Sequence, residues 1–237
     1  MTFSGKTAIV TGGTGALGGE CVRQLLDLNL NVGVPYTSDK SLSNASPDLR
    51  QQPGKVLTVQ TDLTIEDQVA RFVRGVIKRF GTVDYLINTA GGYTGGNTID
   101  QVTLDEWEGI LKVNTLTAFL ISREVLREFR KIGFGRLVNI ASMPALSPSA
   151  KKGPYAVSKR AVVTLTETIA DETRGTGITA NAIAPSTILT EANRRSMPDA
   201  DFSKWVTPKE IAHLAIYLCS DEARSISGNV IKIYGGA

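Results

Sequence analysis

The sequence predicts an α/β fold in which a doubly wound parallel sheet forms a single domain. Short apolar segments alternate with amphipathic helical segments along the whole chain, which is the pattern of a parallel sheet covered by helices on both faces. A glycine-rich turn joins the first strand to the first helix. The 237 residues suffice for one sizeable core and are too few for two ordinary domains of this type. We therefore expect residues 1–237 to form one domain.

The alternation predicts seven strands and five long helices. The strands are expected at Lys6–Val10, Val32–Tyr36, Val56–Gln60, Val83–Asn88, Arg136–Ile140, Thr179–Ile183 and Asn229–Tyr234. The helices are expected from the glycine turn to Leu28 and at Thr64–Phe80, Leu104–Arg130, Pro154–Arg174 and Pro208–Cys219. The serine-rich stretch Thr37–Gly54 is expected to be a surface loop. Each motif described below falls at or just after the carboxyl end of a strand, where such sheets bind ligands.

The glycine-rich turn is Thr11-Gly12-Gly13-Thr14-Gly15-Ala16-Leu17-Gly18. Glycines at this place let the backbone approach a pyrophosphate, and the free N–H groups at the start of the helix bind it. Turns are glycine-rich for other reasons too, but a position between the first strand and the first helix favours a dinucleotide-binding turn. The residues expected to contact the dinucleotide are Gly12, Thr14, Gly15, Ala16, Leu17 and Gly18.

Tyr155 and Lys159 are four residues apart in a predicted helix, and Ser142 lies thirteen residues before Tyr155. Positions i and i+4 share one helix face, with Cβ atoms about 5–6 Å apart. A lysine ammonium about 4 Å away would lower the tyrosine pKa by roughly three units from its usual value near 10. We therefore expect a proton-transfer pair with a serine hydroxyl nearby to hold a substrate oxygen. The pair alone also fits a packed tyrosine beside a solvated lysine, so its meaning depends on the other motifs.

These motifs, in this order, resemble those of the short-chain dehydrogenase/reductase family, and within it the single-domain 3-oxoacyl-acyl-carrier-protein reductases. The resemblance covers essentially the whole chain and implies a Rossmann-type fold. It also implies an NAD(P)-dependent oxidoreductase that interconverts a carbonyl and a secondary alcohol of a small molecule by hydride transfer. The catalytic residues that it implies are Asn114, Ser142, Tyr155 and Lys159, with Tyr155 as the general acid or base.

The same resemblance implies further contacts to the cofactor. Outside the glycine turn they involve Asp62, Leu63, Asn88, Ala90, Gly91, Tyr155, Lys159, Pro185, Ile188 and Thr190. The sequence departs from the family pattern at three positions. Ala16 and Ser186 stand where glycine is usual, and Thr89 replaces the second asparagine of an Asn-Asn-Ala-Gly signature.

The second strand favours NADP over NAD as the cofactor. A carboxylate at the end of this strand would bind the adenosine ribose of NAD and repel a 2′-phosphate, but the strand is followed by Thr37 and Ser38. These hydroxyls, with Lys40, suit a phosphate, and we expect Thr37 to contact it. NAD remains the alternative, because Asp39 is close by and the glycine turn contains no basic residue.

Several interpretations stay open at this point. Asp62 could cap the helix that follows it rather than contact adenine. Arg194, Arg195 and Lys204 fit a solvated loop better than a site for an anionic substrate. A dihydropteridine-reductase-like enzyme is an alternative function, because the glycines around Tyr93 resemble that branch. A non-catalytic NAD(P)-binding sensor is another, although such proteins tend to lack the tyrosine or the lysine.

Composition excludes several classes of partner. The net charge is +3 and the basic residues are scattered, so we expect no nucleic-acid binding. The sequence has no apolar run of about 18 residues and no apolar leader segment, so we expect no membrane insertion and a cytoplasmic location. Two dispersed cysteines and one histidine, His213, predict buried thiols and no metal site.

The predicted helix of Tyr155 also bears on assembly. Its apolar residues Val157, Ala161, Leu165 and Ile169 recur about every four positions, which leaves a face for a partner besides the face on the sheet. Together with the family resemblance, this predicts a homo-oligomer, and more specifically a homotetramer.

Overall fold

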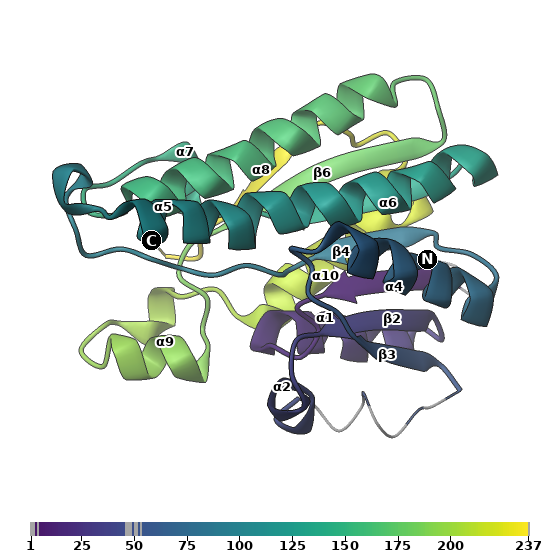
Figure 1. Cartoon of the computed structure of the whole chain (residues 1–237), viewed down its shortest axis with the longest axis horizontal. Coiled ribbons are helices and arrows are strands. Elements are labelled where there is room, and N and C mark those ends of the chain that lie inside the picture. The colour runs from purple at the N-terminus through teal and green to yellow at the C-terminus, as the bar shows by residue number, and fades with distance from the viewer. Residues whose placement is uncertain (1–2, 4, 46–48, 50–51, 53, 237) are drawn as a thin grey trace.

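Seven strands pair in parallel in one sheet within the part of the chain that the structure describes (Figure 1). The structure is a computed structural model and describes residues 3, 5–45, 49, 52 and 54–236. The strands are β1 (Thr7–Thr11), β2 (Asn31–Tyr36), β3 (Val56–Gln60), β4 (Tyr85–Asn88), β5 (Gly135–Ile140), β6 (Ile178–Pro185) and β7 (Val230–Ile233). Their order, β3-β2-β1-β4-β5-β6-β7, is that of a doubly wound sheet and confirms the predicted fold class.

The direction of winding reverses between β1 and β4. Ile9 in β1 pairs with Gly33 in β2 on one side and with Leu86 in β4 on the other. Thr11 and Asn88 pair in register at the carboxyl ends of β1 and β4. Ligands of open parallel sheets bind outside the carboxyl ends of the strands at such a switch point, so the candidate site is expected beside these two residues.

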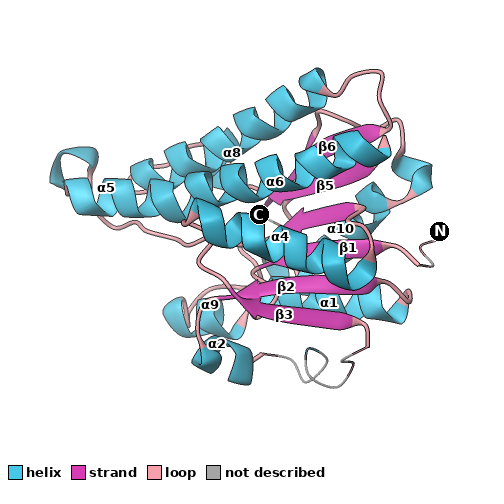
Figure 2. Cartoon of the chain, turned by 45° about the vertical axis from the view of Figure 1, so that its right-hand side comes forward, coloured by secondary structure: helices cyan, strands magenta, loops and turns pink. Residues whose placement is uncertain are grey.

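Long helices cover both faces of this sheet (Figure 2). On one face α1 (Ala16–Asp27) packs against α10 (Pro208–Cys219). The other face is covered by α4 (Glu66–Phe80), α6 (Thr117–Ile132) and α8 (Gly153–Glu172). The described part of the chain also contains the shorter helices α2 (Asp39–Ser43), α5 (Leu104–Leu111), α7 (Met143–Leu146) and α9 (Glu191–Ser196). In Figure 2 the arrowheads of β2 and β3 point toward the end of the molecule where α2, α5 and α9 lie.

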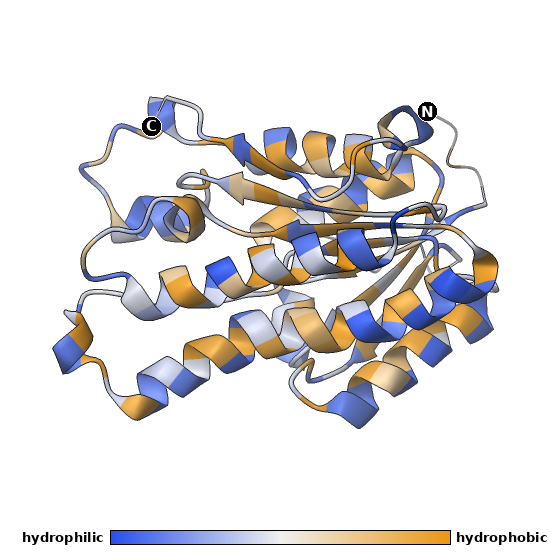
Figure 3. Ribbon diagram, turned by 90° about the horizontal axis from the view of Figure 1, so that it is seen from above, coloured by the Kyte–Doolittle hydropathy of each residue, from blue (hydrophilic) through white to orange (hydrophobic). Residues whose placement is uncertain are grey.

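The two largest apolar clusters lie on opposite faces of the sheet because side chains alternate along each strand. Ala8 and Val10 of β1 pack in the cluster that contains α1 and α10, and Ile9 packs in the cluster that contains α4 and α6. The hydropathy colours of Figure 3 show the strands as mainly apolar and the helices as mixed. Helix α4 lies so close to β2 that a Cβ atom on Gly33 would be 2.6 Å from a methyl carbon of Val76.

Three differences from the sequence prediction have local causes. Residues Asp39–Ser43, predicted as loop, form α2 because Ser38 and Ser41 bond each other's backbone N–H groups in a capping box. The remainder of that predicted loop includes residues 46–48, 50–51 and 53, which lie outside the described residues. Helix α4 begins at Glu66 rather than Thr64, because Thr64 is held by the Asp62 carboxylate. The helix predicted over 104–130 is interrupted by a π-helical segment, Lys112–Leu116.

No helix within the described ranges is both long and apolar enough to cross a membrane.

Candidate active site

Ser142 and Tyr155 meet at the carboxyl end of β5. Ser142 follows that strand as the N-cap residue of α7, and Tyr155 lies in the first turn of α8. The Ser142 hydroxyl is buried and has no hydrogen-bond partner of good geometry among the described residues. It nevertheless lies close enough to the Tyr155 phenol to lower the pKa of that group. A buried hydroxyl without a partner is costly, and a substrate oxygen between the two side chains would satisfy it.

Lys159 lies one helical turn after Tyr155 and is only 6% exposed. Its Nζ atom donates a hydrogen bond to the carbonyl oxygen of Ile140, the last residue of β5, at 2.9 Å. Burial of the ammonium lowers the pKa of Lys159 to about 8. The amine therefore changes charge close to neutral pH, which suits a group that takes part in proton transfer.

Asn114 lies in the π-helical segment between α5 and α6 and is 1% exposed. Its Oδ1 atom accepts a hydrogen bond from the Gly92 N–H at 2.8 Å, and its Nδ2 atom donates to the Gly92 carbonyl at 3.1 Å and to Ser158 Oγ at 2.9 Å. The side chain thus joins α8 to the segment after β4. π-Helical turns are frequent at functional sites because they turn a side chain out of the regular helical register.

Gly91 lies between the functional groups of Asn114 and Lys159. A Cβ atom on Gly91 would be 2.7 Å from Asn114 Oδ1 and 3.0 Å from Lys159 Nζ. The absence of a side chain at this position therefore lets the amide and the amine approach the same short segment of backbone. The sequence prediction had placed these three residues in one site, and the structure brings them together.

The predicted effect of Lys159 on Tyr155 is wrong for this structure. The pKa of Tyr155 is raised from its ordinary value, chiefly by burial, with a further rise from Tyr93 and a partial offset from Ser142. Lys159 is not a cause of this shift, since its amine is directed to the Ile140 carbonyl. Burial raises the pKa because a phenolate loses solvation inside the protein, and the Ser142 hydroxyl offsets only part of this rise.

The glycine turn is built without room for side chains. A Cβ atom on Gly18 would be 2.2 Å from the Gly12 carbonyl oxygen, and Gly12 itself has a φ of 65°. Helix α1 begins at Ala16. Its N-cap residue Gly15 forms no side-chain capping hydrogen bond, and the first turn contains no acidic residue. Such a helix start, next to exposed Gly15 and Ala16, can bind the phosphates of a dinucleotide. Leu17 is buried in the core beneath the turn.

Asn88 links β4 to the neighbouring strands β1 and β5 through side-chain hydrogen bonds. It is 3% exposed, accepts a hydrogen bond from Thr11 Oγ1 and donates to Asn139 Oδ1 at 3.0 Å. Asn139 in turn donates to Thr166 Oγ1 on α8 at 2.8 Å. Thr11 Oγ1 also accepts from the N–H of Ala90 at 3.1 Å. This buried chain of polar groups fixes the spacing of β1, β4, β5 and α8 under the candidate site.

The residues predicted to contact adenine and its ribose lie at the carboxyl ends of β2 and β3. The Asp62 carboxylate accepts hydrogen bonds from the backbone N–H and the hydroxyl of Thr64, at 2.8 and 2.7 Å, which lower the pKa of Asp62. Asp62 thus orders the turn before α4, although Ile65 is the N-cap residue. Leu63 is buried, and Thr37 is exposed just after β2.

The residues predicted to contact the nicotinamide follow β6. Pro185 is the last residue of that strand, and Ile188 forms a bridge with Val206. Thr190 caps α9, since its hydroxyl accepts a hydrogen bond from the Asn193 N–H at 3.2 Å. Ser186, which stands where the family pattern has glycine, donates to the Tyr234 carbonyl at 2.9 Å. This hydrogen bond gives the serine a structural role.

A cavity of about 790 Å³ lies beside the glycine turn. Its lining includes Thr14, Gly15 and Ala16, together with α9 and the start of α10. A cavity bordered by an uncapped helix start suits the phosphates of a dinucleotide.

Sequence reasoning missed several supporting groups. Ser158 accepts a hydrogen bond from Asn114, the Ile140 carbonyl accepts one from Lys159, and Asn139 accepts one from Asn88. Asn139 left a signal in the sequence, because asparagine is unusual inside an otherwise apolar buried strand. The other two leave none, since a backbone carbonyl is present at every position and serine is common in helices.

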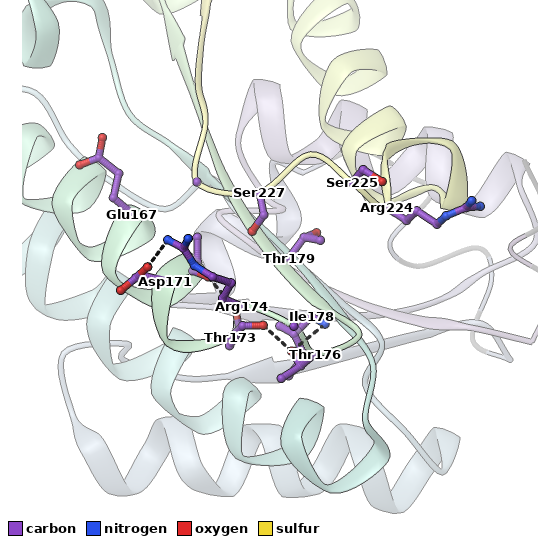
Figure 4. A pocket seen from close by; sticks show the side chains of 13 residues that line it. Glu167, Asp171, Thr173, Arg174, Thr176, Ile178, Thr179, Arg224, Ser225 and Ser227 are labelled. Carbon is purple, nitrogen blue, oxygen red and sulfur yellow. Dashed lines mark hydrogen bonds and ion pairs between the residues drawn. The ribbon is translucent and has the colours of Figure 1, made fainter.

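A second cavity, of about 520 Å³, lies away from these residues. It is formed by the last turn of α8, the start of β6 and the segment before β7 (Figure 4). Its lining contains none of the residues predicted to bind cofactor or to act in catalysis. The cavity is at the amino end of β6, whereas the candidate active site is at the carboxyl ends of the strands.

Known proteins resemble this chain in sequence and structure. A family model described as short chain dehydrogenase matches residues 6–201. Glucose 1-dehydrogenase 2 of Bacillus subtilis is 29% identical, covering 99% of this chain and 95% of that protein. A 3-oxoacyl-[acyl-carrier-protein] reductase of Thermotoga maritima is 27% identical, covering 100% of this chain and 99% of that protein. A solved actinorhodin polyketide ketoreductase with NADPH gives a TM-score of 0.89 at 27% identity, covering 100% of this chain and 98% of that chain.

The match over most of the length agrees with the site geometry, in which the tyrosine, lysine, serine and asparagine motifs meet beside a glycine turn. This chain therefore belongs to the short-chain dehydrogenase family, and it is an oxidoreductase that acts on carbonyl or alcohol groups with a nicotinamide cofactor.

Proposed function

We propose that the protein is an NADPH-dependent reductase of a small-molecule carbonyl compound, with residues 1–237 as one catalytic domain. The observation that carries this proposal is the position of the Tyr155 phenol beside the buried Ser142 hydroxyl at the carboxyl end of β5. A phenol is protonated at neutral pH, so Tyr155 can give its proton to a carbonyl oxygen held between the two side chains. Reduction of a carbonyl requires an acid at this place.

The residues of this chain have distinct roles in the proposed reaction. The cofactor, when bound, supplies the hydride. Ser142 donates a hydrogen bond to the carbonyl oxygen of the substrate and orients it. Tyr155 gives its phenolic proton to that oxygen. Lys159, whose amine is held beside Gly91, would contact the nicotinamide ribose and help to return a proton to Tyr155. Asn114 fixes the Gly91–Gly92 backbone on which this arrangement depends.

The preference for NADPH over NADH rests on the end of β2. No acidic residue ends that strand, and exposed Thr37 offers a hydroxyl to a 2′-phosphate. Asp39 lies in the first turn of α2, after the capping box of Ser38. The homologous ketoreductase solved with NADPH supports the same choice.

We also propose that the enzyme works in the cytoplasm as a homotetramer. Val113, Phe119 and Val157 are 41%, 41% and 45% exposed on the layer formed by α6, α8 and the π-helical segment before α6. Exposed apolar side chains on neighbouring helices favour burial against a second copy. The two free thiols, Cys21 and Cys219, are consistent with a reducing compartment. Light scattering at micromolar concentration should give the mass of four chains, and a monomeric mass would refute this part.

The alternative functions are less well supported. A sensor would not need the buried Lys159 amine, which is costly to maintain. Similarity to named dehydrogenases and reductases across the whole chain does not favour a dihydropteridine reductase. Turnover of a panel of ketones, 3-oxoacyl thioesters and pterins with each reduced cofactor separates these functions.

The decisive variant is Tyr155→Phe, which removes only the phenolic oxygen. We expect the reduction rate to fall at least about 10²–10⁴-fold, while NADPH affinity stays within about twofold of wild type. Tyr217→Phe is the matched control, because Tyr217 is 37% exposed on α10 and lies in no predicted site. Wild-type activity of Tyr155→Phe on any accepted substrate would refute the proposed mechanism.

A further inference from the structure

The cavity beside the glycine turn has two walls that come from distant parts of the sequence. One wall is the turn at Thr14–Ala16, and the other is formed by α9 and the first turn of α10. Helix α9 contributes Glu191 and Arg195, which lie four residues apart and therefore share one helix face. Lys209 of α10 also lines the cavity.

The basic side chains that line this cavity differ in their ion pairs with neighbouring carboxylates. Arg23 forms ion pairs with Glu20 at 2.6 Å and with Asp27 at 2.8 Å. The charge of Lys209 acts on Glu20 and, after Arg23 and Gln24, contributes to the lowered pKa of that carboxyl group. Arg195 has no ion pair within 4.0 Å in the described part of the chain, not even with Glu191. Its guanidinium is exposed and needs no existing pair to be broken before it binds an anion.

Helix α9 is held in place by its own hydrogen bonds. Thr190 caps it, and Asn193 Nδ2 donates to the Ile188 carbonyl at 2.8 Å. Val206 pairs with Ile188 and anchors the segment before α9 beside the start of α10. The helix therefore connects the residues predicted to contact the nicotinamide with a cation beside the glycine turn.

We propose that Arg195 binds a phosphate group of the bound cofactor across this cavity. The inference rests on the proposed function, because it requires the dinucleotide to lie on the glycine turn. That turn contains no basic residue, so it offers a phosphate backbone N–H groups but no full positive charge. A side-chain cation that faces the turn from across the cavity would add this charge. A guanidinium suits this task, since its N–H groups match two oxygens of one phosphate. The negative charge of Glu191 repels the phosphate, so removing that charge should strengthen cofactor binding.

Two kinds of phosphate could be the ligand, the diphosphate or the 2′-phosphate, and four probes distinguish them. Dissociation constants are measured by titration calorimetry for NADPH, NADH, ADP and 2′,5′-ADP with wild type and Arg195→Gln. We expect Arg195→Gln to weaken NADPH binding about fivefold to twentyfold. A diphosphate contact weakens NADH and ADP by the same factor. A 2′-phosphate contact instead weakens 2′,5′-ADP and leaves NADH and ADP unchanged.

Arg194→Gln is the matched control, because the Arg194 guanidinium stacks on Phe202 at 5.1 Å and does not line the cavity. It should bind every probe as wild type does. Arg195→Lys keeps the charge but loses the paired N–H groups, so its affinity should lie between those of wild type and Arg195→Gln. Glu191→Gln should bind NADPH more tightly than wild type. Thermal unfolding checks that the exposed substitutions leave the fold intact.

The possible results distinguish a failure of the Arg195 proposal from a failure of the proposed reductase function. If wild type binds neither NADPH nor NADH, both the proposed reductase function and the role of Arg195 are refuted. If wild type binds NADPH and Arg195→Gln binds all four probes like Arg194→Gln, the role of Arg195 is refuted and the proposed reductase stands. An equal loss of affinity in Arg195→Gln and Arg194→Gln would also refute it, since the loss would then be a general effect of removing a surface charge.

Discussion

The rings of Tyr93 and Tyr155 lie edge to face, with centroids 5.0 Å apart and planes at 68°. Tyr93 is 63% exposed and covers the side of Tyr155 next to the segment after β4. Gly95 makes this position available, because a Cβ atom there would be 2.5 Å from the Tyr93 hydroxyl. Tyr93 thus shields the predicted proton donor from water.

The first prediction concerns the pH dependence of reduction. Burial is the largest cause of the raised pKa of Tyr155, and Tyr93 adds to it. Tyr93→Ala admits water, so the pKa of Tyr155 should move down toward its ordinary value near 10. Because reduction needs the protonated phenol, the rate in this variant should begin to fall at a lower pH than in wild type. The pH profile of kcat measures this.

Tyr93→Phe is the control for that experiment. It keeps the ring that covers Tyr155 and removes only the hydroxyl, so its profile should lie between those of wild type and Tyr93→Ala. Identical profiles for wild type and Tyr93→Ala would show that Tyr93 does not control solvation of the phenol.

The second prediction concerns Gly91. In Gly91→Ala the new methyl group would lie 2.7 Å from Asn114 Oδ1 and 3.0 Å from Lys159 Nζ, so both groups must move. We expect a loss of about 1–3 kcal/mol in the free energy of unfolding. We also expect a large fall in reduction rate. Gly109→Ala is the control, since nothing lies within 4 Å of its added carbon and alanine favours helix. Equal stability of the two variants would contradict this assignment.

The third prediction concerns Asn114. Asn114→Ala removes three hydrogen bonds and leaves the Gly92 backbone groups and Ser158 Oγ without that partner. The free energy of unfolding should fall by about 2–3 kcal/mol. Thr115→Val, which loses one hydrogen bond to the Ser158 carbonyl, should lose about 1 kcal/mol. Urea unfolding measures both, and a smaller loss for Asn114→Ala than for Thr115→Val would contradict the proposed clamp.

The fourth prediction concerns the cost of the Lys159 charge. Its pKa falls from 10.5 to about 8 on folding. At pH 7 both the folded and unfolded forms are protonated, and the buried charge costs about 3 kcal/mol of stability. Between about pH 8 and 10.5 the unfolded chain binds more protons than the folded one, so this cost is relieved as the pH rises.

Lys159→Met should therefore be inactive yet more stable than wild type at pH 7, with the difference shrinking by pH 10. Lys78→Met, at an exposed position on α4, provides the control and should change stability little at either pH. A Lys159→Met protein that is less stable than wild type at pH 7 would show that the bond to Ile140 outweighs the buried charge.

Much of the fold was predictable because it depends on local apolar patterns. β3 has the predicted bounds, Val56–Gln60, and the other strands differ by a few residues at their ends. The serine-rich segment that forms α2 was missed, because its helix depends on Ser38 and Ser41 bonding the backbone rather than on apolar spacing. Side-chain capping of this kind is a matter of geometry that composition does not reveal.

The candidate site was predictable as a set of residues and not as a set of contacts. The motifs placed Asn114, Gly91 and Lys159 together, and the structure brings them to within a few ångströms of each other. Sequence spacing also suggested that Lys159 would act directly on Tyr155, whereas its amine binds the Ile140 carbonyl. Spacing fixes which helix face a side chain occupies, but burial and rotamer decide which neighbour it bonds.

The packing of α1 against α10 has a practical consequence for following the unfolding of this protein. Cys21 and Cys219 lie buried on these two helices, and burial raises the pKa of both thiols well above the ordinary range. Since the thiolate is the reactive form, a thiol reagent should reach them only when this layer opens. The rate of labelling therefore reports the opening of one side of the sheet, without a probe added to the chain.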